Sequence, residues 1–517
     1  MIERVRSPTL AATGHETLVS LHQHHRPMVP SLSPGTIVAL TVFLAATAVG
    51  LTAAADRRTK TVETTPAGNR TATLDAYGGW TDIKGTATGW FHLEAINGRT
   101  LLVTPDGHGF VALGINHFNT LKGHGAGEPN LFQDRYGGDW GKFAAEVGRQ
   151  YAAWGFNTVD HGVEPLRRVR PYFASRDLVR NSKYFARPGE PNPWEFPDVF
   201  DPAVAARLER DTEAFCREHR DSRFLIAYHW TDTPTWDIHK TRAFRQTDWV
   251  TEIRQLSSTA PGWKAYVGFL QEVYRNNLAA FNRAYRINAD SFAGLTAASF
   301  RAVDLYRYEV ERDDQAFLGQ IARRYYGIVG AAMKRHDPHH LVFGEKYLLG
   351  DIPSQVLAAA APHIDAIALQ PGDGYIPIYT PGDLFPGEEI ATLHRLIDRP
   401  VFICDHQISF ATSRYPIAIW PYHQRQDEAD AADATGRFLR EAFEKPYVIG
   451  YMRCQYIDRF SPRRGAIKLG LVRDDGTPYA KLLDATVQAN ADVKQLVRQA
   501  AGWPGGVSQP VRLAPDR

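Results

Sequence analysis

Cysteine is scarce in this chain, with three residues among 517. Cys216, Cys404 and Cys454 provide no disulfide framework and no metal-ligand spacing. The sequence also lacks an H-E-x-x-H motif, and its first predicted strand contains no H-x-H pair, so two common zinc-hydrolase patterns are missing. We therefore expect buried thiols, with a Cys404–Cys454 bridge as the alternative, and neither a metal nor another cofactor.

An excess of charge of either sign is also missing. The chain has 59 Lys and Arg against 57 Asp and Glu, which gives a net charge of +2. This balance gives no reason to expect a nucleic acid or another polyanion as partner. The content of 44% hydrophobic and 22% charged residues is typical of a globular protein. One α/β barrel with long insertions would account for most of this length.

One long uncharged run is present near the N-terminus, from residue 36 to residue 55, and it ends in Ala53-Ala54-Ala55. This pattern predicts that residues 1–55 are a signal peptide or an N-terminal membrane anchor, and Met28 as the start would give a conventional leader. We therefore expect a secreted, periplasmic or cell-surface protein, which contacts the membrane only if the segment stays uncut. Residues 56–79 are expected to form a disordered spacer and residues 491–517 a flexible tail.

From residue 80 to residue 490 the chain alternates predicted strands with predicted helices, after small N-terminal β elements. This alternation indicates an α/β fold, a (β/α)8 TIM barrel with a helical insertion after the fourth strand, at 235–295. A single helix is expected at 261–285 within that insertion. The eight strands are expected at 110–116, 154–160, 170–174, 224–228, 340–344, 364–369, 401–404 and 448–452.

Two of these apolar strands end abruptly in an acid, Asp232 after the fourth and Asp405 after the seventh. A carboxylate next to a buried strand is costly to desolvate, and barrel enzymes place their chemistry at the C-terminal ends of the strands. Two acids on different strands of one barrel are the groups that glycosidic-bond cleavage needs. Other polar residues at the predicted strand ends are candidate substrate contacts: Asn116, His117, Asp160, His161, Glu345, Lys346, Gln370, His406 and Gln455.

Several longer segments carry a family resemblance. They are LLVTPDGHGFVALGINHF from residue 101, WGFNTVDHG from 154, FPDVFDP from 196, PGWKAYVGFLQEVYRNNLAAFNRAYRI from 261 and GLVRDDGTPYAKL from 470. In this order, over about residues 80–487, the chain resembles clan A glycoside hydrolases and more narrowly the agarases of glycoside hydrolase family 50. The resemblance implies a polysaccharide or oligosaccharide substrate such as a galactan, with an acid/base after the fourth strand and a nucleophile after the seventh.

The chain departs from that family at both catalytic positions, where the family has Glu and this sequence has Asp232 and Asp405. Retaining glycosidases hold their carboxyl groups about 5–5.5 Å apart, so two shorter side chains on an unchanged backbone would stand roughly 7–8 Å apart, within the inverting range. We therefore predict inversion, with Asp232 as general acid and Asp405 as the base for water. A backbone shift that preserves retention is the alternative.

Aromatic residues make up 11% of the chain, and sugar rings stack on aromatic side chains. Trp230, Trp236 and Trp420 are candidate stacking platforms, with core or loop packing as the alternative for each. The first two could also provide apolar surroundings that raise the pKa of Asp232. Competing interpretations assign Asp232 to a turn at Thr233 and Asp405 to an ion pair with Lys346 or Arg453. Glu345 is the rival to Asp405 as the catalytic carboxylate. For the whole chain, a non-catalytic carbohydrate-binding barrel and a metal-dependent hydrolase stay open.

Overall fold

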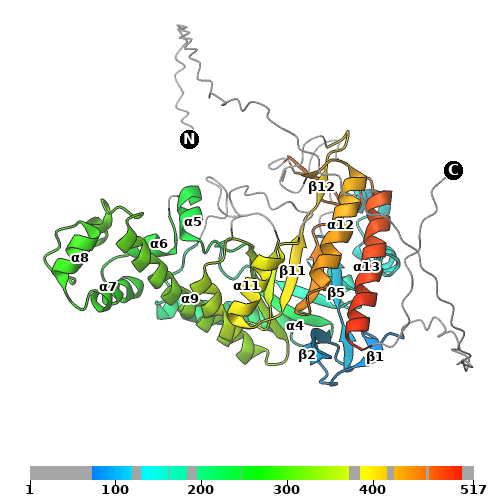
Figure 1. Ribbon diagram of the computed structural model, residues 1–517, viewed down its shortest axis with the longest axis horizontal. Coiled ribbons are helices and arrows are strands. Elements are labelled where there is room, and N and C mark those ends of the chain that lie inside the picture. The colour runs from blue at the N-terminus through cyan, green and yellow to red at the C-terminus, as the bar shows by residue number, and fades with distance from the viewer. Residues whose placement is uncertain are drawn as a thin grey trace, which may run out of the picture. The chain divides into compact units, whose positions relative to one another are not determined.

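The computed structural model describes residues 73–118, 130–160, 162–182, 195–245, 247–371, 385–415, 424–461 and 465–502. The predicted leader, 1–55, lies outside these residues. Figure 1 shows a barrel surrounded by helices, with further helices α5–α8 extending to one side of it. Across the described residues, no helix is both long enough and apolar enough to cross a membrane.

Eight parallel strands close into a barrel, which confirms the predicted (β/α)8 fold. In chain order these strands are β5 (Ala112–Ile115), β6 (Thr158–Val159), β7 (Tyr172–Ser175), β8 (Leu225–Asp232), β9 (Leu341–Leu348), β10 (Ile367–Gln370), β11 (Val401–His406) and β14 (Val448–Arg453). Each strand pairs with the next, and β14 pairs with β5 to close the ring. All eight C-terminal ends therefore lie at one mouth, where the predicted acids are found.

The outer layer consists of helices between the strands. They are α1 (Leu131–Tyr136), α2 (Trp140–Ala153), α3 (Glu164–Arg167), α4 (Pro202–His219), α9 (Tyr308–His336), α10 (Ser354–Ala360), α11 (Gly387–Ile397), α12 (Glu428–Phe443) and α13 (Ala480–Ala500). The side chain of Asp201 accepts a hydrogen bond from the Ala203 amide and so caps α4 at its N-terminus. The predicted end of the barrel domain at residue 490 falls inside α13, whose helix continues to Ala500.

A four-stranded antiparallel sheet covers the N-terminal end of the barrel. It consists of β1 (Trp80–Lys84), β2 (His92–Ile96), β3 (Arg99–Val103) and β4 (His108–Phe110), in the order β1-β4-β3-β2. Asn97 and Gly98, both at positive φ, turn the chain from β2 into β3. Phe91, Leu102 and Phe110 join the apolar cluster inside the barrel. The sheet therefore packs as a floor beneath the strands.

The insertion after β8 is helical, as predicted. It contains α5 (Ile238–Arg245), α6 (Trp249–Gln255), α7 (Pro261–Val273), α8 (Leu278–Tyr285) and a short 3-10 helix, Ala297–Phe300. The single helix expected at 261–285 is wrong, because Arg275 and Asn276 adopt left-handed backbone conformations and separate α7 from α8. Asn277 then caps α8 by accepting a hydrogen bond from the Ala280 amide.

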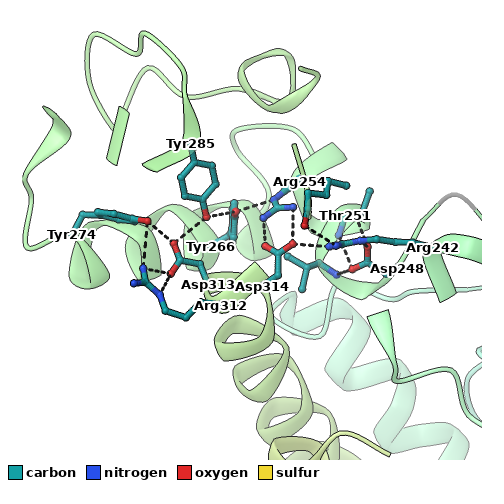
Figure 2. A network of polar contacts seen from close by, with 12 residues as sticks. Arg242, Asp248, Thr251, Arg254, Tyr266, Tyr274, Tyr285, Arg312, Asp313 and Asp314 are labelled. Atoms are coloured by element: carbon teal, nitrogen blue, oxygen red, sulfur yellow. Dashed lines mark hydrogen bonds and ion pairs between the residues drawn. The ribbon is translucent and has the colours of Figure 1, made fainter. Parts of the chain in front are cut away.

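A buried ionic network fastens this insertion to α9 (Figure 2). Asp314 of α9 pairs with Arg254 of α6 and with Arg242 of α5, whose Nη2 atom lies 2.6 Å from an Asp314 oxygen. Arg242 also pairs with Asp248, the N-cap residue of α6, at 2.6 Å. All four side chains are nearly or fully buried. Paired burial of this kind holds three helices in one arrangement.

The remaining described elements are short. They are β12 (Ser409–Phe410) with β13 (Gln424–Arg425), the hairpin of β15 (Arg459–Ser461) and β16 (Gly465–Ile467), and a 3-10 turn, Ala361–His363.

Candidate active site

Asp232 and Asp405 both lie at the C-terminal mouth of the barrel, on β8 and β11. The ammonium group of Lys346, on β9, connects them electrostatically. Its Nζ atom lies 3.7 Å from Asp405 Oδ2, and the attraction of both carboxylates contributes to its high pKa. The structure thus brings together the two acids that the sequence singled out, with a buried cation between them.

The Asp232 carboxyl group has the properties of a proton donor. Part of the side chain is accessible, but burial of the carboxyl group, followed by the Asp405 carboxylate, raises the pKa of Asp232 to about 7. Gln370 of β10 donates a 2.6 Å hydrogen bond to Asp232 Oδ1 and acts in the opposite direction, as does Lys346. An acid with a pKa near neutrality can be protonated at neutral pH and still release its proton readily.

Asp405 is held by direct contacts from two other strands of the barrel, β5 and β9. The amide of Asn116, just after β5, donates a hydrogen bond to Asp405 Oδ1, while Lys346 approaches Oδ2. The side chain is buried, with 5% of its surface exposed. The predicted ion pair with Lys346 is therefore present, and it serves to orient the carboxylate.

Lys346 is itself held by a third carboxylate. Asp160, which follows β6, lies 2.5 Å from the Lys346 ammonium and is also bonded by Ser175 of β7 at 3.3 Å. Burial disfavours the charged ammonium, but Asp160, Asp405 and Asp232 outweigh that effect and hold the pKa of Lys346 well above its usual value. Lys346 therefore remains a fixed positive charge in the mouth.

Three residues at the mouth adopt left-handed backbone conformations that non-glycine residues seldom take. His117 has a φ of 63°, Thr233 of 52° and Asp405 of 53°. His117 and Thr233 follow β5 and β8, and Asp405 is the penultimate residue of β11. Strained conformations of this kind concentrate at functional sites, where surrounding contacts hold them. These three backbone conformations therefore indicate a functional site at the same mouth, and this evidence does not depend on the charges of the side chains.

Glu345 is separate from this group, contrary to the predicted substrate contact. Neighbouring strand residues point to opposite faces, so Lys346 faces the mouth while Glu345 faces α9. There its carboxylate accepts hydrogen bonds from Trp236 Nε1 at 2.7 Å, from Tyr325 at 3.2 Å and from Tyr326. Burial raises the pKa of Glu345 to about 7. The contacts describe a buried structural carboxylate.

Trp230 and Trp236 are candidate stacking platforms in the sequence, but both are fully buried. Trp236 stacks on Trp249 with ring centroids 4.7 Å apart, and Trp230 packs against Tyr326. Rings enclosed in this way are core residues, because no face is open to a ligand. The high pKa of Asp232 is therefore better attributed to its own burial and to Asp405.

Two further candidates point elsewhere. His406 stacks on Phe438 of α12 at 3.8 Å, and its Nδ1 atom lies 2.8 Å from the Tyr451 hydroxyl, so it faces the helical layer. The Gln455 side chain donates to the Ile457 carbonyl at 2.8 Å and braces the chain after β14. His161 and Trp420 lie outside the described residues.

Two residues near the mouth were missed as site candidates from the sequence. Asp177 accepts a 3.3 Å hydrogen bond from the Asp232 amide. The sequence predicts the third strand to end at 174, and an acid three residues beyond a strand end carries no strand-end signal. Cys454 follows β14, and its sulfur lies within 4.8 Å of ligand atoms of His117 and Asp405. In the sequence, the only feature that points to Cys454 is its position just after the eighth predicted strand.

The barrel fold and the acids at its mouth resemble those of clan A glycoside hydrolases. Comparison with known proteins narrows this resemblance to the agarases. No protein-family model matches the chain. It is 22% identical over 499 residues to β-agarase B of Vibrio sp. (strain JT0107), a match covering 81% of this chain and 50% of that protein. β-Agarase A of the same organism is 23% identical over 365 residues, covering 65% and 34%. The chain thus spans half or less of the length of these curated relatives.

Solved structures agree with these matches. An exo-β-agarase superimposes with a TM-score of 0.67 at 18% identity, covering 82% of this chain and 68% of that one. A second agarase gives a TM-score of 0.66 with the same identity and coverage. These likenesses establish a shared fold, and together with the sequence matches they confirm the predicted resemblance to the family 50 agarases.

Proposed function

We propose that this protein is a glycoside hydrolase that uses Asp232 and Asp405 as its carboxyl pair. The observation that carries the proposal is the pair itself: two carboxyl groups from β8 and β11, joined electrostatically through Lys346, one with a pKa raised to about 7. Different environments for two neighbouring carboxyl groups assign the roles of acid and base. The named activity of the related agarases supports the same reaction class.

In the proposed mechanism, protonated Asp232 gives its proton to the glycosidic oxygen as the bond from that oxygen to the anomeric carbon breaks. Asp405 takes a proton from a water molecule, whose oxygen forms the new bond to the anomeric carbon from the opposite face. Lys346 and Asn116 hold Asp405 in place for this step. The product has the inverted configuration. Both acids end in the opposite protonation state and are reset by exchange with solvent.

For the substrate, we propose an agar-like galactan or its oligosaccharides, as the names of the relatives suggest. Such polymers are too large to be taken up intact, so we also propose export, by the predicted leader at 1–55, to the periplasm, the cell surface or the medium. Membrane contact would follow only from an uncut leader.

The test is hydrolysis of a panel of galactan oligosaccharides by the wild type and by Asp232→Asn and Asp405→Asn, with NMR detection of the first anomer formed. We expect each substitution to lower kcat by at least about 100-fold, as loss of a positioned acid or base does, and the wild type to give the inverted anomer. Asp484→Asn is the matched control, because Asp484 is an exposed acid on α13. Full activity in both variants would refute the proposal, and a retained anomer would refute the inverting mechanism.

A non-catalytic carbohydrate-binding barrel is the second candidate, because the predicted resemblance puts Asp at both positions where the family has its catalytic Glu. The same panel separates the two functions. A binding barrel would retain sugar affinity, measured by calorimetry, and would show no turnover in the wild type.

A further inference from the structure

Three side chains of types that can bind metals converge at the barrel mouth, and one of them is Asp405 of the carboxyl pair. His117 lies two residues after β5, Asp405 is on β11 and Cys454 follows β14, and these three strands are neighbours in the barrel. One ligand atom from each, an imidazole nitrogen, a carboxylate oxygen and the thiol sulfur, lies within 4.8 Å of the other two. Asp405 and Cys454 are buried and His117 is half-buried. An S, N, O donor set matches the borderline-soft character of zinc.

The spacing is close to what zinc requires. Bond lengths of about 2.0–2.3 Å in a tetrahedral site put neighbouring ligand atoms roughly 3.5 Å apart. Separations of up to 4.8 Å therefore need to shorten by about 1.3 Å at most, which rotation of the His117 and Cys454 side chains can supply.

A buried amide beside these three side chains is a second observation that favours a bound cation. Asn116 has no exposed surface, and its Oδ1 atom has no hydrogen-bond partner among the described residues. Its amide nitrogen is bonded to Asp405, so the side chain lies against that carboxylate. A buried carbonyl oxygen without a partner is costly. A metal ion, or a water molecule bound to that ion, would satisfy it.

The local charge also favours a cation. The ammonium group of Lys346 interacts with three carboxylates, Asp160, Asp405 and Asp232, and its nearest partner is Asp160. With Asp160 and Asp405 ionised and Asp232 protonated, these four groups carry a net charge of −1, and ionisation of Asp232 brings it to −2. A divalent ion would neutralise that excess.

We propose that His117, Asp405 and Cys454 bind a zinc ion, with Asn116 as fourth ligand or as partner of a bound water. The binding site stands on this geometry alone. Its consequence rests on the proposed function: zinc bound to Asp405 occupies the lone pairs that would take a proton from water, so the ion inhibits hydrolysis reversibly. Zinc here acts against the carboxyl chemistry and takes no part in it.

Cobalt is the direct probe of the site, because Co²⁺ bound to a thiolate gives a ligand-to-metal charge-transfer band in the near ultraviolet. Metal-free protein is titrated with Co²⁺ and then with Zn²⁺ as competitor. We expect one equivalent of Co²⁺ to give the band in the wild type and Zn²⁺ to remove it. Cys454→Ser should lose the band and bind Zn²⁺ at least about 10-fold more weakly.

Cys216→Ser is the matched control, since Cys216 is a buried thiol on α4 that contacts Met333. It should keep the band. His117→Asn provides a second variant with weaker binding should Cys454→Ser fail to fold, as judged by circular dichroism. No band in the wild type, or a band lost in Cys216→Ser and kept in Cys454→Ser, would overturn the site.

Activity then tests the consequence separately. Zn²⁺ should inhibit the wild type, EDTA should restore its rate, and Cys454→Ser should require at least about 10-fold more Zn²⁺ for half-inhibition relative to its own metal-free rate. Loss of activity on chelation would overturn the inhibitory role while the cobalt band still reports the site. An enzyme without measurable turnover would refute the proposed function and leave the spectroscopic result standing.

Discussion

At the scale of single residues, Asp232 and Asp405 differ in what surrounds them. Asp232 is bonded by Gln370 and lies next to Asp177, whereas Asp405 is bonded by Asn116 and approached by Lys346. We therefore expect Asp232 to be the protonated member of the pair and Asp405 the ionised one. This assignment makes the pH dependence of the reaction a direct test.

We predict that kcat/KM falls about tenfold per pH unit above pH 7, because Asp232 must be protonated to act and its pKa is raised to about 7. The Gln370 hydrogen bond favours the ionised form, so Gln370→Ala should move this limb to higher pH. Gln455→Ala is the control, since that amide bonds a backbone carbonyl. A limb that stays in place in Gln370→Ala would contradict the assignment.

Glu345 gives a stability prediction of known sign. Below its unfolded-state pKa, near 4.5, the carboxyl group is protonated in both states. As pH rises toward 7, the unfolded chain releases the proton while the folded protein keeps it, so stability falls. The loss is complete above pH 7 and amounts to about 3 kcal/mol.

Glu345→Gln should remove most of that loss. Urea unfolding at pH 5 and pH 8 measures it: the wild type should lose free energy of unfolding between the two values, and the variant should lose less. Glu388→Gln, at an exposed position of α11, should behave as the wild type does. Equal pH dependence in Glu345→Gln and wild type would show that Glu345 titrates normally.

At the scale of elements, the ionic network around Asp314 decides whether the helical insertion stays attached to α9. Removing one partner of a buried pair leaves the other charges unpaired, so Asp314→Ala should cost about 3–5 kcal/mol. Hydrogen exchange should quicken in α5 and α6 first. Asp433→Ala removes one member of an exposed pair with Arg437 and should cost at most about 0.5 kcal/mol. Unchanged exchange in Asp314→Ala would contradict the anchoring role.

The barrel strands could be predicted from the sequence because each is an apolar run followed by polar residues. The break between α7 and α8 could not. No Gly or Pro stands there, both left-handed residues, Arg275 and Asn276, are exposed, and of the two only Asn is a residue type that favours this conformation. Local propensity alone favours one continuous helix at such a place.

The candidate site was predictable to a similar extent. Asp232 and Asp405 stand out because an acid follows an apolar strand. Glu345 and His406 follow strands just as closely, but they point outward toward α9 and α12. Whether a strand-end residue faces the mouth depends on register, and a shift of one residue reverses it. Register is fixed by neighbouring strands, which the sequence does not display.

At the scale of the whole molecule, one aromatic cluster joins the barrel to the sheet beneath it. Phe402 lies 4.4 Å from Phe173 and 5.6 Å from Phe343, measured between ring centroids. We predict that Phe402→Ala costs about 3–5 kcal/mol, because the cavity cannot close among rigid strands. Thermal unfolding should shift for the whole barrel. Tyr308→Ala, at a side chain 75% exposed, should change stability by about 0.5 kcal/mol or less.

The apolar packing at the base of the barrel also affects how substrate enters and how product leaves. Among the described residues, Phe91, Leu102 and Phe110 help to fill the base of the barrel, so we expect a solute to reach Asp232 from the opposite face. The products would then leave through the same opening by which the substrate entered. Product release would limit the rate of each catalytic cycle whenever bond cleavage is fast.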